Sequence, residues 1–243
     1  MSDLASALIA ARRGSAVPRD PDLVPGDLQA AMHVQRDVCL DLGETVAGWK
    51  VGFSPDGVPV AGPLYASVVQ PSPARTPLPM RGFIVEIELA FRLARDLPRG
   101  SYAREDILDA VDQALIGIEL VAGRLGEPPA TPYLAFLADN IGNAGYVTGA
   151  ATREFARLDL KALPLRFAID GRVTEEKRGG HPQGDPVEPL RAYASQQIDA
   201  LGGLRKGQIV TTGSLSKPLL VEAPGRLEAT LDGVGSVALD LAR

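Results

Sequence analysis

The stretch Phe83-Ile84-Val85-Glu86-Ile87-Glu88-Leu89-Ala90-Phe91 decides the fold, because its apolar and branched residues recur with the period of a β-strand. Successive side chains of a strand point to opposite faces. The face that we expect to meet the core carries Phe83, Val85, Ile87 and Leu89. The opposite face carries Glu86 and Glu88, flanked by Ile84 and Ala90.

The two glutamates would lie roughly 6–7 Å apart at Cβ, given the rise of a strand. Their carboxylates repel each other unless something positive lies between them, and hard divalent cations prefer such oxygen ligands. Glu86 and Glu88 are therefore candidate metal ligands. The alternative is a solvent-facing strand surface with two ordinary acids, which is common for so short a motif.

Composition narrows the classes of partner and metal. Of 243 residues, 45% are hydrophobic and 23% are charged, which is typical of a globular protein. The net charge of -5 disfavours a nucleic acid or an anionic membrane as the main partner. One cysteine and two histidines disfavour a zinc site, and the plentiful carboxylates make Mg²⁺, Mn²⁺ and Ca²⁺ the metals to consider.

The sequence predicts a cytoplasmic protein without internal disulfides. Cys39 is the single cysteine. No apolar run approaches the length of a membrane span. The opening Met1-Ser2-Asp3-Leu4 lacks the charged-then-apolar layout of a signal peptide.

We expect two regions within one continuous structural unit. Residues 1–44 form a small helical segment, with helices over 2–13 and about 25–42. Residues 45–243 form a β-rich domain with peripheral helices. Hairpin signals at Asp170-Gly171 and Asp232-Gly233 favour mixed or antiparallel sheets over a doubly wound parallel sheet. The predicted class is α+β.

Within the β-rich region, the pattern predicts strands over 46–53 and 115–121. It predicts a loop over 54–63 and helices over 102–114 and 186–201. No dinucleotide-binding or P-loop motif follows a strand.

Glu119 is a third candidate ligand, because it interrupts the apolar run Ile116-Gly117-Ile118-Glu119-Leu120-Val121. A carboxylate buried there is costly unless it is paired, hydrogen-bonded or bound to a metal. The residues leave two alternatives open, a metal ligand or a buried salt bridge with an arginine such as Arg124.

Lys50 lies mid-strand between Gly48 and Gly52, which would let a ligand or another chain segment approach closely. A partly buried lysine there could bind a substrate carboxylate or donate a proton. The alternative is a lysine that extends to solvent from a strand edge.

Two polar segments follow apolar ones. Asp139-Asn140 and the run 213–216, which includes Ser214, could supply polar site groups, although each alone is typical of a turn or cap. His181, in a glycine-rich loop, is expected to be exposed.

Taken together, the ordered set of motifs resembles the hydratase/decarboxylase branch of the fumarylacetoacetate hydrolase superfamily. The matching pieces run through nearly the whole chain: Gln35, Gly48-Trp49-Lys50-Val51-Gly52, Val85-Glu86-Ile87-Glu88-Leu89-Ala90-Phe91, Ile118-Glu119-Leu120-Val121, Ala138-Asp139-Asn140, Gly213-Ser214 and Gly233-Val234-Gly235-Ser236-Val237. The third ligand is more often Asp in the hydrolase branch, so Glu119 favours the hydratase/decarboxylase branch.

The resemblance implies a mixed β-sandwich-like roll around Mg²⁺ or Mn²⁺, and homo-oligomers. It implies that Glu86, Glu88 and Glu119 hold the metal. A small 2-oxo or 2-hydroxydienoic acid is the expected substrate. We expect its contacts, and the proton and water chemistry, to come from Lys50, Asp139, Asn140 and Ser214.

The reaction that the resemblance implies is metal-dependent addition of water to a 2-hydroxy-2,4-dienoate, which gives a 4-hydroxy-2-oxo acid, as in meta-cleavage degradation of aromatics. The alternatives are decarboxylation of a 4-oxalocrotonate-type acid, hydrolysis of an acylpyruvate, and a non-catalytic partner subunit. The chain departs from the family's pattern in two segments. Residues 62–68, around Ala66, carry no acid, and Ala122-Gly123-Arg124 lacks the usual serine.

Overall fold

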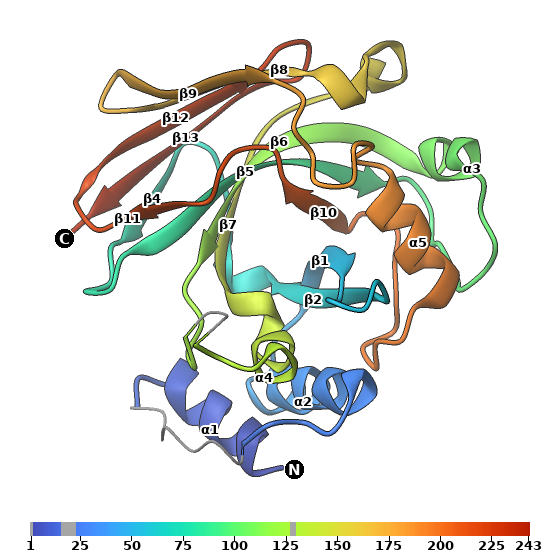
Figure 1. Ribbon diagram of the computed structural model, residues 1–243, viewed down its shortest axis with the longest axis vertical. Coiled ribbons are helices and arrows are strands. Elements are labelled where there is room, and N and C mark those ends of the chain that lie inside the picture. The colour runs from blue at the N-terminus through green and yellow to red at the C-terminus, as the bar shows by residue number, and fades with distance from the viewer. Residues whose placement is uncertain (1, 16–22, 127–129) are drawn as a thin grey trace.

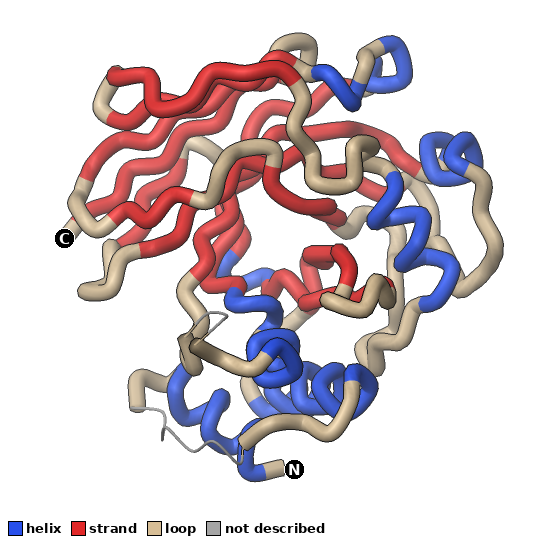
Figure 2. The backbone as a smooth tube through the Cα atoms, in the orientation of Figure 1, coloured by secondary structure: helices blue, strands red, loops and turns tan. Residues whose placement is uncertain are grey.

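Two mixed β-sheets with helices at their periphery make up the computed structural model, which describes residues 2–15, 23–126 and 130–243. Figure 2 shows most of the helical segments gathered at one end and along one side of the sheets. This arrangement confirms the predicted α+β class with mixed sheets. No helix among the described residues is long and apolar enough to span a membrane.

The larger sheet has eight strands in the order β2-β1-β10-β5-β6-β7-β3, with β11 also pairing with β5. Most neighbours are antiparallel, whereas β1 pairs in parallel with β10 and β3 with β7. Its strands are β1 (Val46–Phe53), β2 (Pro59–Tyr65), β3 (Val69–Pro71), β5 (Phe83–Leu93), β6 (Val111–Val121), β7 (Asn143–Thr152), β10 (Ile209–Ser214) and β11 (Leu219–Val221).

The smaller sheet has five strands in the order β4-β13-β12-β8-β9. Its strands are β4 (Ala74–Pro77), β8 (Pro164–Ile169), β9 (Arg172–Arg178), β12 (Gly225–Leu231) and β13 (Gly235–Ala242). The β8–β9 turn confirms its sequence signal, because Asp170 and Gly171 both have the positive φ, 49° and 76°, that a two-residue hairpin turn favours.

The two faces of β5 belong to two different interiors, as its alternation predicts. Val85, Ile87 and Leu89 lie in the main core, which also takes side chains from the smaller sheet. Ala90, on the face of the two glutamates, packs in a separate cluster with side chains from β2, β6, β7 and β10. Strands this far apart in the sheet order share a cluster because the larger sheet curls, and β2 also contacts β7. The glutamates therefore face the inside of the curl.

The helices close one end and one side of the curled sheet (Figure 1). They are α1 (Asp3–Arg12), α2 (Leu28–Asp41), α3 (Arg104–Asp109), α4 (Tyr133–Ala138) and α5 (Glu188–Gln196). Helix α1 packs on α2, α2 packs on α4 and β2, and α5 packs on β1, β2 and β10. Ser2 and Asp27 cap α1 and α2 by accepting hydrogen bonds from the backbone N–H groups of Ala5 and Ala30.

Three predicted elements are wrong in extent or type. The loop predicted over 54–63 contains most of β2, an edge strand that tolerates Pro59 and Pro63 because its outer side needs no ladder donors. The helix predicted over 102–114 spans only α3, because β6 begins at Val111. The helix predicted over 186–201 ends at Gln196, where Gln197 turns left-handed with φ 30°.

The helical segment is joined to the β-rich region through a buried side chain, Gln35 of α2. Its Nε2 donates to the carbonyl oxygens of Ala61 in β2, at 3.0 Å, and Leu137 in α4, at 2.6 Å. Buried carbonyl groups need hydrogen-bond donors, so the one amide of Gln35 joins α2 to both β2 and α4.

Replacing Gln35 with Leu should lower the free energy of unfolding by about 2 kcal/mol, because two buried carbonyl oxygens lose their donor. Urea denaturation would measure the change. Gln29→Leu, on the exposed face of the same helix, is the matched control and should change it by less than about 0.5 kcal/mol. Equal effects of the two substitutions would contradict the joining role of Gln35.

Candidate active site

Three carboxylates meet inside the curl of the larger sheet. Glu86 and Glu88 project from one face of β5, and Glu119 of β6 lies directly across the ladder from Glu86. One oxygen of each side chain lies within 4.8 Å of the others. Glu88 and Glu119 are fully buried, whereas Glu86 reaches a pocket that opens to solvent. The register thus brings together the three acids that the sequence singled out.

Lys50 projects into the same cluster from β1. Its Nζ lies 2.8 Å from Oε2 of Glu119 and 3.6 Å from Oε2 of Glu86. Burial alone would lower the pKa of Lys50, but the charges of Glu119 and Glu86 outweigh burial and raise it, so the ammonium is retained. The salt bridge considered for Glu119 therefore exists, with Lys50 as partner and not Arg124.

The neighbours of Lys50 explain its placement. Trp49 points the other way, is fully buried beneath α5, and its ring centroid lies 6.4 Å from that of Tyr193. A Cβ at Gly48 would lie 2.1 Å from the carbonyl oxygen of Ile209, so only glycine lets β10 pair this closely with β1. The motif Gly-Trp-Lys thus fixes the strand and aims the lysine inward.

The two buried glutamates have polar supports that the sequence analysis missed. Thr211 of β10 donates its hydroxyl to Oε2 of Glu88, and Nδ2 of Asn143 donates to Oε1 of Glu119 at 2.9 Å. Burial raises the pKa of both carboxyl groups, well above the ordinary range for Glu88, even though Lys50 opposes the shift. Both residues lie close to motifs that the sequence singled out. Thr211 precedes Gly213 in β10, and Asn143 follows the Asp139-Asn140 pair.

The cluster also contains the chemistry of a cation site. Oε1 of Glu88 is buried and accepts no hydrogen bond from any described residue. Three carboxylates against one ammonium leave the cluster negative when all are ionised. An oxygen-only donor set with an unpartnered buried oxygen fits a hard divalent cation.

A pocket of about 420 Å³ opens beside Glu86 and Lys50. Its polar lining includes Thr212 and Ser214 of β10, and Thr212 Oγ1 is buried with no hydrogen-bond partner among the described residues. A bulge in β10 sets Ser214 opposite Glu88, because Thr211 and Ser214, three residues apart, pair with Ala90 and Glu88, which are two apart. Lys50 and Ser214 therefore share this pocket with a metal-ligand candidate.

His181 was expected to be exposed and is buried at the wall of this pocket, so that prediction is wrong. Its Nε2 lies 3.0 Å from the Thr212 carbonyl oxygen, and its Nδ1 accepts from the backbone N–H of Gln183 at 3.2 Å. These partners fix the tautomer with the proton on Nε2. Burial lowers the pKa of His181, so the ring is neutral near pH 7.

Asp139 and Asn140 do not line the pocket. Asp139 accepts hydrogen bonds from the backbone N–H and the guanidinium of Arg124 and from the guanidinium of Arg12 in α1. Nδ2 of Asn140 donates to the carbonyl oxygen of Pro63 at 3.3 Å. Two arginines enclose the Asp139 carboxylate, so the geometry gives no support to its predicted role in water activation.

The turn at Asn140 and Ile141, which lies between Asp139 and the site, has a strained backbone. Asn140 and Ile141 have φ values of 56° and 54°, and a branched side chain such as isoleucine rarely adopts this left-handed conformation. Ile141 thereby reaches the pocket, and Asn143 reaches Glu119 just beyond the turn. The arginine-held Asp139 thus lies where it can stabilise this turn.

Two tyrosines near the acids were also missed. Tyr133 of α4 lines the pocket, and burial raises its pKa to about 12, although Lys50 opposes the shift, so its hydroxyl keeps its proton. Tyr146 of β7 extends its hydroxyl over Gly117, where a Cβ would lie 2.1 Å from that oxygen. Both tyrosines have apolar neighbours in the sequence, so their pattern is that of ordinary core residues.

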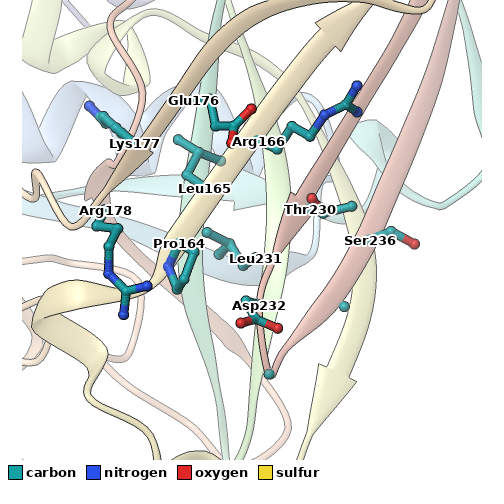
Figure 3. A pocket seen from close by; sticks show the side chains of 12 residues that line it. Pro164, Leu165, Arg166, Glu176, Lys177, Arg178, Thr230, Leu231, Asp232 and Ser236 are labelled. Atoms are coloured by element: carbon teal, nitrogen blue, oxygen red, sulfur yellow. The ribbon is translucent and has the colours of Figure 1, made fainter.

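A larger hollow of about 800 Å³ lies on the smaller sheet and is shown in Figure 3. Exposed side chains of both signs line it, among them Arg166, Glu176, Arg178 and Asp232. Neither the carboxylate cluster nor Lys50 borders this hollow. The chemistry therefore favours the smaller pocket over the larger one.

Comparison with known proteins identifies the family and the fold. The sequence profile described as "Fumarylacetoacetate (FAA) hydrolase C-terminal" matches residues 56–241. A 2-keto-4-pentenoate hydratase from Burkholderia vietnamiensis is 30% identical over 219 residues, which cover 86% of this chain and 82% of that protein. A 2-hydroxyhexa-2,4-dienoate hydratase from Comamonas testosteroni is 29% identical, over 81% of this chain and 78% of that protein.

A solved structure shows that the fold is shared almost end to end. The 4-oxalocrotonate decarboxylase from Pseudomonas putida G7, complexed with magnesium and adipate, has a TM-score of 0.85 at 19% identity, covering 98% of this chain and 96% of that one. This likeness confirms the predicted architecture. The profile match over most of the sequence and the 30% identical relative establish that the chain belongs to the fumarylacetoacetate hydrolase family.

Proposed function

We propose that the protein is a metal-dependent hydratase, a lyase that adds water to a 2-hydroxy-2,4-dienoate to give a 4-hydroxy-2-oxo acid. The observation that carries the proposal is the cluster of Glu86, Glu88 and Glu119 beside Lys50 at one pocket. Relatives named as hydratases over more than three quarters of this chain support it.

In this proposal Glu86, Glu88 and Glu119 hold one divalent cation, Mg²⁺ or Mn²⁺. When bound, the cation would supply Lewis-acid polarisation of the 2-oxo-carboxylate head of the substrate. Thr211 and Asn143 fix the carboxylates of Glu88 and Glu119, since partners of this kind orient ligands before the metal arrives.

The remaining pocket groups bind and orient the substrate. The Lys50 ammonium attracts the substrate carboxylate and can relay a proton, as its position beside Glu86 allows. Ser214 offers its hydroxyl oxygen as an acceptor, since its own proton is donated to the Ser216 carbonyl oxygen at 2.9 Å. Tyr133, which keeps its proton, supplies a further donor.

The overall change is addition of one water molecule. The dienol loses its hydroxyl proton and gains a proton on the carbon chain, which gives a 2-oxo-enoate. Water then forms a C–O bond at C4, its proton is released, and C3 is protonated. The short charge-paired path between Lys50 and Glu119 offers a route for these protons.

His181 has a structural part in this proposal. Its two ring nitrogens join the loop after β9 to the backbone of β10 beside Ser214, and both are used. It therefore holds the pocket wall and does not act as acid or base while those bonds persist.

The proposed reaction predicts loss of the dienol ultraviolet absorbance of 2-hydroxypenta-2,4-dienoate when Mg²⁺ is present. Chelator should abolish the loss, and mass spectrometry should identify a 4-hydroxy-2-oxo acid as product. Release of CO₂ from 4-oxalocrotonate, without hydration of the dienol, would instead establish the decarboxylase alternative.

Replacing Glu86 with Gln should weaken Mn²⁺ binding by more than about 100-fold, because a neutral amide replaces one charged ligand. Titration calorimetry on the folded apoprotein would measure the affinity independently of turnover. Glu105→Gln, on the exposed surface of α3, is the matched control and should bind as the unchanged protein does. Unaltered Mn²⁺ affinity in Glu86→Gln would show that Glu86 is not a metal ligand.

The His181 contacts should make stability depend on pH. Burial lowers its pKa below the ordinary value of about 6.5, so the contribution is complete above that value and is lost as the pH falls through the folded-state pKa. Melting temperatures between pH 5 and 8 would show the loss. In His181→Gln this component of the slope should be absent, and an unchanged slope would contradict the assignment.

A further inference from the structure

We infer that this site selects dienoates with an uncharged, apolar tail and discriminates against those with a second carboxylate at the far end. The inference rests on the proposed function, because it assigns the head of the substrate to Glu86 and Lys50. It adds the chemistry of the tail, which the arrangement of the remaining pocket residues determines.

The pocket continues from the acids into a contiguous apolar surface. Ile84 lies two residues from Glu86 on the same face of β5, and Val121 lies across the ladder from Ile84. Phe136 of α4 adjoins Val121, because a Cβ at Gly142 would lie 2.6 Å from the ring of Phe136 and 2.9 Å from Val121. The strained turn adds Ile141 to this wall.

The described lining offers no free positive charge for a second carboxylate. Lys50 is its one lysine or arginine, and the proposed function assigns that ammonium, paired with Glu119 and Glu86, to the head of the substrate. His181 is neutral, with both ring nitrogens bonded to backbone groups. Arg124 does not line the pocket and binds Asp139 and the carbonyl oxygen of Asn143.

A tail carboxylate would therefore leave water for an apolar wall without a counter-ion. An unpaired carboxylate is costly in such surroundings, far more so than a methyl group of similar size. An extended alkyl tail, in contrast, gains from covering Ile84, Val121 and Phe136. The same wall thus both favours one tail and disfavours the other.

Two substrates that differ only at the tail make the test. In 2-hydroxyhexa-2,4-dienoate the chain ends in a methyl group, and in 2-hydroxyhexa-2,4-dienedioate it ends in a carboxylate. With Mg²⁺ bound, kcat/KM for hydration of the first, followed as the 4-hydroxy-2-oxo acid formed, should exceed that of the second by at least about 100-fold. Equal or reversed values for this hydration would overturn the inference and leave the hydratase proposal in place. Failure of the metal-loaded protein to hydrate any of three substrates, these two and 2-hydroxypenta-2,4-dienoate, would instead overturn the proposed function.

A charge placed in the wall should change the preference. Phe136 is half-buried, so Phe136→Arg can add a guanidinium with little loss of core packing. We expect this variant to narrow the ratio of the two kcat/KM values by about 10-fold or more, whereas the matched Phe136→Leu retains the preference for the methyl tail. Melting temperatures confirm that each variant folds. An unchanged ratio in folded Phe136→Arg would contradict the placement of the tail against Phe136.

Discussion

The contact between the Lys50 ammonium and the Glu119 carboxylate depends on the curl of the larger sheet. The two residues lie on β1 and β6, three strands apart in the sheet order, yet their charged atoms are 2.8 Å apart. In a flat sheet three spacings of about 4.8 Å would separate the strands by about 14 Å. The contact closes because the sheet bends around the interior into which both side chains project.

The buried carboxylates explain why polar side chains line that interior. Like charges on Glu86, Glu88 and Glu119 repel, and one ammonium cannot balance three carboxylates. Thr211 and Asn143 each satisfy one carboxylate oxygen, and an oxygen of Glu88 remains without a partner. A site assembled in this way is costly without a cation, and the cation of the proposed function would link metal binding to the stability of the curled sheet.

The alternation of β5 was enough to predict its two faces and the convergence of its glutamates, because period-two patterns map directly onto a strand. Glu119 was recognisable as a charge within an apolar run. The contacts of Asp139 and His181 were not predictable, since each has a partner from a distant segment, Arg12 in the first case and Thr212 in the second. Strand β2 was missed because its buried residues do not alternate and its prolines are typical of loops.

The Tyr146 hydroxyl occupies the volume that a side chain at Gly117 would need, and this packing has an evolutionary consequence. Position 117 pairs directly with Glu88, so any residue larger than glycine there would force the tyrosine ring away from the acids. Descendants of this sequence can gain a side chain at 117 only after, or together with, a smaller residue at 146. The two positions, 29 residues apart in the chain, should therefore diverge as a pair, and the order of the two substitutions would decide whether the intermediate protein retains its site.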